Sequence, residues 1–324
     1  MKMFDFDLDD ARASYSEHGW VHLVGGLHRD YLVEIRRQID EARTAAPLRG
    51  KGLRGEKDQR LVELGEGMTW DAELFDVVAP LCGLRRDAMT LSERHIKSYR
   101  PDADPCPTAH KDRYASQISV GLTIESPEGS HLVLFPETDR GENPYLDARL
   151  RESLEPAQLP EVVLDGAPEV TIHDRPGDVV IFPGSSMWHL RRGAAGTTVV
   201  YVKLNDFGCD PLGEDPNTAA RRAETLAVAE TGDEAMLLRS IPTLARRFDS
   251  VNREHRREGW PEFLVANVWG VPPFPVSDQE FSVLRTLDGV ATLGELVDRC
   301  GPATTSAVRR LARRGAVDLL RDAR

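Results

Sequence analysis

The feature that most constrains the fold is a series of short apolar segments between Leu91 and Asn205, separated by glycine and proline. The segments are rich in valine, isoleucine and tyrosine, and each has the length of a β-strand. They read SERHIKSYRP, QISVGLTIE, SHLVLFP, PEVTIHD, GDVVIFPG and TTVVYVKLN. Short strands with turn residues between them are typical of a β-sandwich or a β-barrel. The middle of the chain is therefore predicted to form a β core.

Helical patterns flank this core on both sides. In the N-terminal third, apolar residues recur at intervals of three and four, which predicts an amphipathic helix; they are Tyr31, Leu32, Ile35, Ile39 and Ala42. A long helical stretch is expected from about Thr218 to Arg257, interrupted near Gly232 and Pro242. Three short helices are expected between Ser277 and Arg314, before the apolar run AVDLL. Together with the β core, these patterns predict an α+β protein.

The breaks between these patterns suggest a division into three parts. We expect residues 1–209 to form the β core with its N-terminal helices, and residues 210–270 to form a helical connector. Residues 271–324 would form a small winged-helix-like module, because three short helices there lead into a possible hairpin. The segment 47–60, PLRGKGLRGEKDQR, has few apolar residues and is expected to be a loop, either a lid or a solvated connector.

The composition limits the classes of protein to which this chain can belong. Its 41 Lys and Arg residues against 53 Asp and Glu give a net charge of −12, which disfavours binding to nucleic acid or anionic membranes. No apolar run is long enough to span a membrane, and the N-terminus has acidic residues where a signal peptide needs a cationic start. The four cysteines lack CxxC spacing, so neither a zinc knuckle nor a disulfide framework is expected. These features predict a soluble cytoplasmic protein.

Two motifs contain the residues that are best suited to metal binding or catalysis. The first is AHKDR at 109–113, and the second is GDVVIFPGSSMWH at 177–189. On a β-strand His110 and Asp112 project to the same side, so both can reach one metal ion, and His189 can supply a third ligand from a distant strand. Two imidazoles and one carboxylate on one face of an octahedron leave three positions open, which suits non-haem Fe(II) and O₂ chemistry. A bare HxD pair is also compatible with an ordinary surface pair.

The order of these motifs resembles that of the iron(II)/2-oxoglutarate-dependent dioxygenase superfamily. The resemblance covers roughly Leu91 to Asn205 and is strongest to the prolyl-hydroxylase-like and phytanoyl-hydroxylase-like branches. It implies a double-stranded β-helix, or jelly-roll, core in which His110, Asp112 and His189 bind Fe(II). It also implies 2-oxoglutarate as co-substrate, with Tyr99 lining its pocket.

The resemblance departs from the family at the residue that would anchor the co-substrate. Relatives usually have a basic residue nine to eleven positions after the distal histidine, but this chain has Thr198, Val199 and Val200 there. Lys203, fourteen positions after His189, is the nearest candidate, although it is equally compatible with a strand-end lysine that reaches water. Arg191 is a further candidate for the co-substrate or for the substrate.

The family comparison also implies a type of reaction. Halogenating relatives lack the ligand carboxylate, whereas this chain retains Asp112, so hydroxylation of an unactivated C–H bond is expected, with release of succinate and CO₂. We expect a small polar substrate, such as an amino acid or an intermediate of specialised metabolism. Alternatives are a peptide or protein hydroxylase that uses the C-terminal module for recognition or homodimerisation, and a non-catalytic jelly-roll metal sensor. The sequence identifies neither the substrate nor the role of the C-terminal module.

Overall fold

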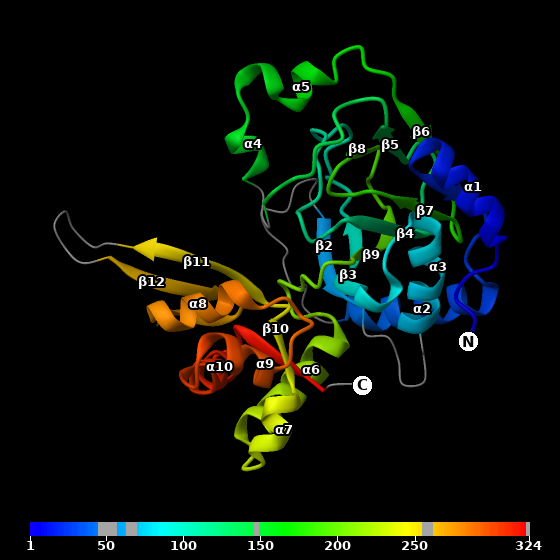
Figure 1. The fold of residues 1–324 in the computed structure, drawn as a ribbon. Helices are drawn as coiled ribbons and strands as arrows, with labels where there is room; N and C mark the ends of the chain where they lie inside the picture. Colours follow the sequence, from blue (N-terminus) through cyan, green and yellow to red (C-terminus); the bar gives the residue numbers. More distant parts are fainter. Residues whose placement is uncertain (45–56, 63–69, 146–148, 255–261, 322–324) are drawn as a thin grey trace. The chain divides into compact units, whose positions relative to one another are not determined.

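The fold is described from a computed structural model that covers residues 1–44, 57–62, 70–145, 149–254 and 262–321. The chain forms two compact units, Met1–Phe207 and Gly208–Arg324 (Figure 1). Both units combine helices with antiparallel sheets, as expected for an α+β protein. None of the described helices is both long and apolar enough to cross a membrane.

A six-stranded antiparallel sheet forms the larger layer of the first unit. Its strands lie in the order β1 (Val21–Leu23), β7 (Val179–Phe182), β4 (Ile118–Glu125), β9 (Thr198–Asn205), β3 (Thr90–Tyr99) and β2 (Lys57–Leu61). β9 lies at the centre, paired with β3 on one side and β4 on the other. Its residues are all buried, which explains the almost continuous apolar run in its sequence.

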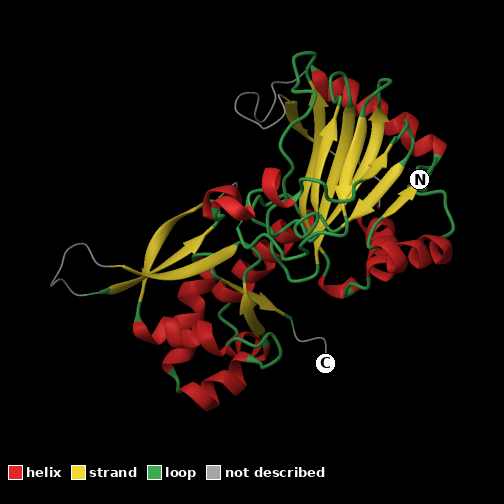
Figure 2. Cartoon of the chain, turned by 90° about the horizontal axis from the view of Figure 1, so that it is seen from above, coloured by secondary structure: helices red, strands yellow, loops and turns green. Residues whose placement is uncertain are grey.

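A second, three-stranded antiparallel sheet packs against the first. It has the order β6 (Val170–Ile172), β5 (His131–Phe135) and β8 (Trp188–Arg192). Figure 2 shows the strands of the chain as yellow arrows and its helices in red. The two sheets share one buried cluster, in which Leu132 and Leu134 of β5 meet Phe182 of β7 and Val199 of β9. The first unit is therefore a two-layered β structure with an interior between its sheets.

Helices cover the other face of the six-stranded sheet. They are α1 (Leu8–His18), α2 (Arg29–Arg43) and α3 (Trp70–Cys82). Tyr31, Ile35 and Ile39 of α2 are buried in the same cluster as Ile96 of β3 and Val200 of β9, so the predicted amphipathic helix is confirmed. The remaining helices of this unit are short: η1 (Arg86–Ala88), α4 (Leu150–Ser153), η2 (Pro156–Gln158) and α5 (Pro160–Val163).

Two local predictions for the first unit need correction. The expected loop 47–60 is wrong for residues 57–60, which belong to β2 and pair with β3; residues 47–56 lie outside the described residues. The HxD motif does not lie on a regular strand, since only His110 forms a bridge, to His189. Pro105 and Pro107 precede the motif and cannot donate hydrogen bonds to a ladder, which limits strand formation there.

The second unit contains more β structure than the sequence analysis predicted. Its elements are α6 (Pro216–Glu230), α7 (Glu234–Arg239), β10 (Ile241–Leu244), β11 (Phe248–Glu254), β12 (Phe263–Val268), β13 (Val271–Val276), α8 (Asp278–Thr286), α9 (Leu293–Cys300), α10 (Ala303–Arg313) and β14 (Val317–Leu320). The helical prediction for 218–257 is correct as far as Arg239 and wrong for the residues of β10 and β11; residues 255–257 lie outside the described residues. Pro242 prevents helix continuation, and sheet pairing satisfies the backbone of β10 and β11 instead.

The last three helices form as expected from the sequence. Ser277 and Thr292 each begin a helix with a capping box, paired with Glu280 and Glu295 respectively. The final strand β14 pairs with β10 rather than with a neighbouring hairpin strand. The winged-helix-like character of this module therefore stays a prediction.

Candidate metal centre

Three side chains that are distant in the sequence meet inside the first unit. His110, Asp112 and His189 each offer one ligand atom, and these atoms all lie within 4.8 Å of one another. The strand β8 positions His189, and reciprocal backbone hydrogen bonds of 2.9 Å join His110 to His189. The backbone N–H of Asp112 donates to the carbonyl of Gly184 at 2.8 Å. Backbone pairing to one segment, 184–189, thus brings the HxD motif to the distal histidine.

The carboxylate of Asp112 is held on both oxygens. Its Oδ1 accepts a hydrogen bond from Lys203 Nζ at 2.5 Å, and its Oδ2 accepts one from Ser119 Oγ at 2.7 Å. Asn143 Nδ2 donates to the backbone carbonyl of Asp112 at 2.9 Å. The side chain of Asp112 is only 9% exposed. A carboxylate fixed in this way keeps one orientation and retains lone pairs for a metal ion.

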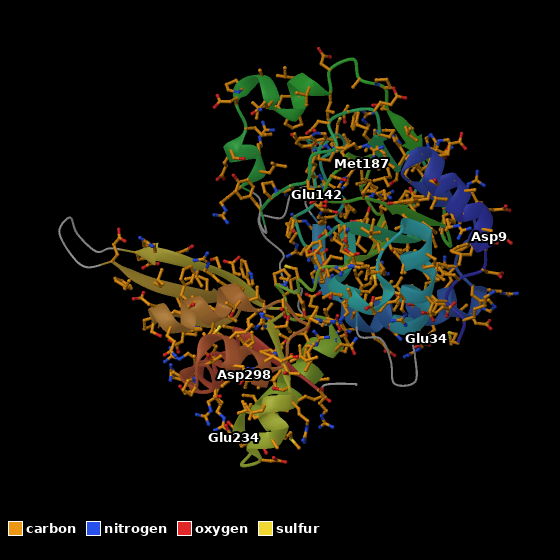
Figure 3. The ribbon with its side chains drawn as sticks, viewed as in Figure 1. Asp9, Glu34, Glu142, Met187, Glu234 and Asp298 are labelled. Carbon is orange, nitrogen blue, oxygen red and sulfur yellow. The ribbon has the colours of Figure 1, made fainter. Side chains whose placement is uncertain are left out.

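The two imidazoles present their Nε2 atoms to Asp112. His189 Nε2 lies 3.8 Å from Asp112 Oδ2, and His110 Nε2 lies 4.0 Å from Oδ1. The Nδ1–H of His189 donates to the carbonyl of Met187 at 2.9 Å, which assigns the lone pair to Nε2. Met187 directly precedes β8 and lies within the first unit (Figure 3). Such a hydrogen bond orients a histidine for metal binding.

The charges of the three side chains match the requirements of a divalent metal. Burial lowers the pKa of both His110 and His189, so their imidazoles are neutral at pH 7. Burial alone would raise the pKa of Asp112, but the nearby positive charges, with Lys203 the largest contributor, together outweigh burial and hold that pKa well below its usual range. Two neutral imidazole nitrogens and one ionised carboxylate form a donor set suited to ferrous iron.

A buried network of opposite charges adjoins Asp112. Glu93 lies on β3, and its Oε1 is 2.8 Å from Lys97 Nζ and 3.8 Å from Lys203 Nζ. Arg113 donates a hydrogen bond to the other oxygen of Glu93. These cations outweigh the effect of burial, which would raise the pKa of Glu93, and hold that pKa well below its usual range. Glu93 is therefore a buried anion that interacts with the three cations Lys97, Lys203 and Arg113.

A second polar group lies in the interior around Arg191. Its guanidinium donates to the carboxylate of Asp174 at 3.0 and 2.7 Å, and it interacts electrostatically with the phenols of Tyr99 and Tyr201. The side chain of Arg191 is 3% exposed, and its Nε has no hydrogen-bond partner among the residues that the structure describes. Lys57 Nζ lies 5.3 Å from the centre of the Tyr99 ring. The group combines an unsatisfied guanidinium donor with tyrosine hydroxyls and a nearby amine, which suits an anion.

The predicted metal ligands and the predicted co-substrate residues differ in how the structure places them. His110, Asp112 and His189 come together as expected, and Arg191 lies close to Tyr99. The ammonium of Lys203 contacts Asp112 instead, so its position differs from that of the other co-substrate candidates.

Sequence reasoning missed several residues of this interior. Ser119 and Gly184 stand in apolar runs with nothing to distinguish them from structural residues, and Asp174 ends the strand-length segment PEVTIHD, where nothing marks it as functional. Glu93 had a detectable signal, since Glu93, His95 and Lys97 stand at alternate positions of a segment predicted to be a strand of the β core. Charged residues at alternate positions of a buried strand indicate a polar interior.

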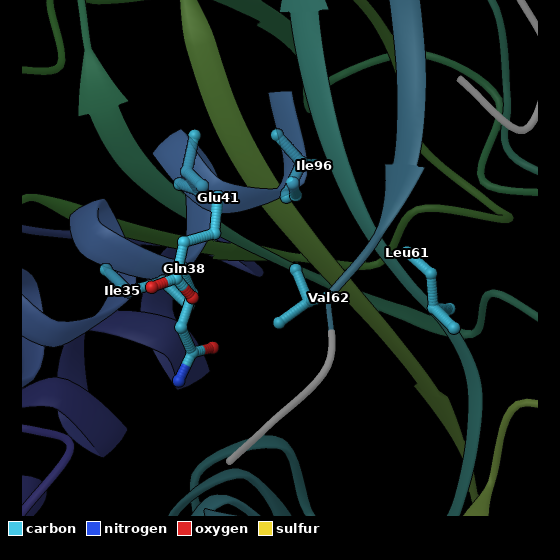
Figure 4. A pocket seen from close by; sticks show the side chains of 8 residues that line it. Ile35, Gln38, Glu41, Leu61, Val62 and Ile96 are labelled. Atoms are coloured by element: carbon cyan, nitrogen blue, oxygen red, sulfur yellow. The ribbon is translucent and has the colours of Figure 1, made fainter. Parts of the chain in front are cut away.

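A separate cavity lies on the outer face of the six-stranded sheet. It has a volume of about 240 Å³ and is lined by α2, β2 and β3 residues including Ile35, Gln38, Leu61 and Ile96 (Figure 4). Ile96 points away from the interior that its neighbours His95 and Lys97 face, because side chains alternate along β3. This cavity is thus distinct from the candidate metal centre.

Comparison with known proteins gives structural similarity without sequence similarity. No family model and no curated protein sequence matches the chain. Among solved structures, the non-heme alpha ketoglutarate dependent carbocyclase SnoK from nogalamycin biosynthesis is 16% identical, with a TM-score of 0.43 over 60% of this chain and 83% of that one.

Two further solved structures give similar values. The Pseudomonas putida prolyl-4-hydroxylase is 16% identical, with a TM-score of 0.41 over 61% of this chain and 98% of that one. A Burkholderia pseudomallei oxidoreductase of the 2OG-Fe(II) oxygenase family is 13% identical, with a TM-score of 0.41 over 64% and 93%. Because the sequence identities and TM-scores are this low, the functional proposal below is based on the geometry of the site.

Proposed function

We propose that the protein is a non-haem Fe(II)/2-oxoglutarate-dependent oxygenase. The observation that carries this proposal is the convergence of two neutral imidazoles and one ionised carboxylate, with ligand atoms within 4.8 Å of one another. His110, Asp112 and His189 would hold the ferrous ion on one face and leave the other face for co-substrate and O₂. When bound, the iron supplies the activation of O₂ that side chains cannot provide.

The path of the chain supports a jelly-roll core. From β3 onward the strands alternate between the two sheets: β3, β4, β7 and β9 belong to the larger sheet, while the bridge at His110, β5 with β6, and β8 belong to the smaller one. This alternation is the winding of a double-stranded β-helix. It supports the proposal because the bridge between His110 and His189 brings the HxD motif beside the strand that carries the distal histidine.

We propose that Arg191 and Tyr99 bind the distal carboxylate of 2-oxoglutarate. The Nε–H of Arg191 is a buried donor that needs an acceptor, and its guanidinium interacts electrostatically with the phenol of Tyr99. The amines of Lys57 and Lys97 lie beside the two tyrosine rings, although burial lowers the pKa of Lys57 to about 7. A dicarboxylate would satisfy the unpaired donor and would favour the protonated form of Lys57.

Replacing Arg191 with glutamine should weaken 2-oxoglutarate binding at least tenfold, because a charge-assisted hydrogen bond is lost. The measurement is a titration of 2-oxoglutarate against the Mn(II)-loaded protein by calorimetry. Arg192→Gln is the matched control, since the neighbouring arginine pairs with Glu169 at the surface and should leave the affinity unchanged. Tyr99→Phe, which preserves the fold, should weaken binding in the same direction. Equal affinities in all four proteins would assign the co-substrate to other residues.

We further propose that the reaction is hydroxylation of a small polar substrate. The interior around the candidate centre is lined by charged and hydroxyl side chains, which would orient polar groups of such a substrate. Asp112 occupies the carboxylate position, which favours hydroxylation over halogenation. The test is succinate release from Fe(II), O₂ and 2-oxoglutarate with a panel of amino acids. Substrate-stimulated succinate release supports the proposal, and its complete absence with and without substrates contradicts it.

A further inference from the structure

The ammonium of Lys203 lies between two buried carboxylates of the first unit. Its Nζ is 2.5 Å from Asp112 Oδ1 and 3.8 Å from Glu93 Oε1. All three side chains are less than a tenth exposed, so solvent screens their interactions weakly. A small movement of the side chain would carry the ammonium from one carboxylate to the other.

In the metal-free protein, the contact with Lys203 balances the charge of the Asp112 carboxylate. Asp112 is buried, and a buried carboxylate without a cationic partner is strongly destabilising. Ser119 contributes one neutral hydrogen bond to Asp112, and the Nε2 atoms of His189 and His110 lie farther away, at 3.8 and 4.0 Å from its oxygens. Lys203 is therefore the cation in direct contact with this carboxylate among the described residues.

A divalent metal ion bound to Asp112 would make the contact between Lys203 and Asp112 less favourable. The metal would bring two positive charges to the carboxylate that Lys203 already occupies, and like charges at such a distance repel strongly in a buried site. Glu93 offers Lys203 another anionic partner: one of its oxygens faces Lys97 and the other Arg113, and a carboxylate can accept about four hydrogen bonds.

We propose that Lys203 is a resident counter-cation that holds Asp112 in place without metal and moves onto Glu93 when the metal binds. This inference rests on the proposed function, since it takes Asp112 as a metal ligand. It makes Lys203 and Glu93 positioning residues with opposite effects: Lys203 competes with the metal for Asp112, and Glu93 draws Lys203 away.

The experiment measures Mn(II) affinity by the loss of the free-ion EPR signal, together with thermal unfolding with and without Mn(II). Lys203→Met has a similar volume and no charge, and because it removes the positive charge that repels the metal it should bind Mn(II) at least about tenfold more tightly than wild type. Without metal this variant should unfold at a lower temperature than wild type, and Mn(II) should raise its melting temperature by more. Glu93→Gln should bind Mn(II) at least about tenfold more weakly.

Lys111→Met is the matched control. Lys111 stands between the two ligands in sequence, but its ammonium binds the carbonyls of Asp139 and Gly141, so the variant should keep the wild-type Mn(II) affinity. Should Lys203→Met not fold, the change in Mn(II) affinity of Glu93→Gln tests the inference, which predicts weaker binding. Weaker binding by Lys203→Met, or unchanged binding by Glu93→Gln, would overturn the inference while leaving the proposed metal site intact. Wild-type protein that binds no Mn(II) would overturn the proposed function as well.

Discussion

Replacing His110 with alanine should lower the Mn(II) or Fe(II) affinity by more than about a hundredfold, and it should abolish succinate formation. The reason is that the site has three protein ligands, and loss of a residue that merely supports a ligand already costs about 10–100-fold. His110 is the best choice because its side chain is 36% exposed and neutral, so its removal leaves no buried charge behind. Metal affinity is measured by EPR titration, and the fold by circular dichroism.

His18→Ala is the control for the His110 variant. His18 ends α1 and is an exposed histidine of the same unit, so its removal should change neither metal affinity nor the melting temperature. A His110→Ala protein with wild-type metal affinity would remove this residue from the metal site and with it the proposed ligand set.

The second large effect is expected at Gly184, whose carbonyl accepts the hydrogen bond from the Asp112 backbone. A Cβ at this position would lie 2.6 Å from Asp112 Oδ2 and even closer to Ser119 Oγ. Gly184→Ala should therefore displace the carboxylate and weaken Mn(II) binding at least tenfold. Overpacking of this kind also costs about 1–3 kcal/mol of stability. The measurements are Mn(II) titration and chemical denaturation.

The control for this substitution is Gly232→Ala. A Cβ at Gly232 meets no atom within 4 Å among the described residues, so metal affinity and stability should both stay at wild-type values. Gly184→Ala with unchanged metal affinity and unchanged stability would contradict the close packing of Gly184 against the ligand carboxylate. A loss of stability with metal affinity intact would support the close packing but contradict the role of Asp112 as a metal ligand.

The fold of the first unit was largely predictable because its signals are local. Strand-length apolar runs marked β3, β4, β5, β7 and β9, and the three- and four-residue spacing of Tyr31, Ile35 and Ile39 marked α2. The strand β2 was missed because its residues, KDQRL, are polar and its pairing with β3 is a long-range interaction. The strand β10 was missed for a related reason, since its partner β14 lies far along the chain. The strand β11 was missed because its sequence, FDSVNRE, is largely polar, although its partner β12 is the next strand in the sequence.

The candidate site was predictable only in part. The HxD motif and distal histidine have a recognisable spacing, and the structure brings all three together. The roles of the surrounding charges depend on which side chains meet across the interior, and sequence spacing contains no such information. Lys203 illustrates this limit: its place on β9 suggested a co-substrate anchor, whereas its ammonium lies against Asp112.

The most direct test of the proposed function is the visible spectrum of the protein with Fe(II) and 2-oxoglutarate in the absence of O₂. The proposal predicts a weak metal-to-ligand charge-transfer band when 2-oxoglutarate joins the Fe(II)-loaded protein, because the co-substrate would chelate an iron held by His110, Asp112 and His189. The same band should be absent from His110→Ala. A wild-type spectrum that shows no such band at saturating Fe(II) and 2-oxoglutarate would contradict the assignment of this site.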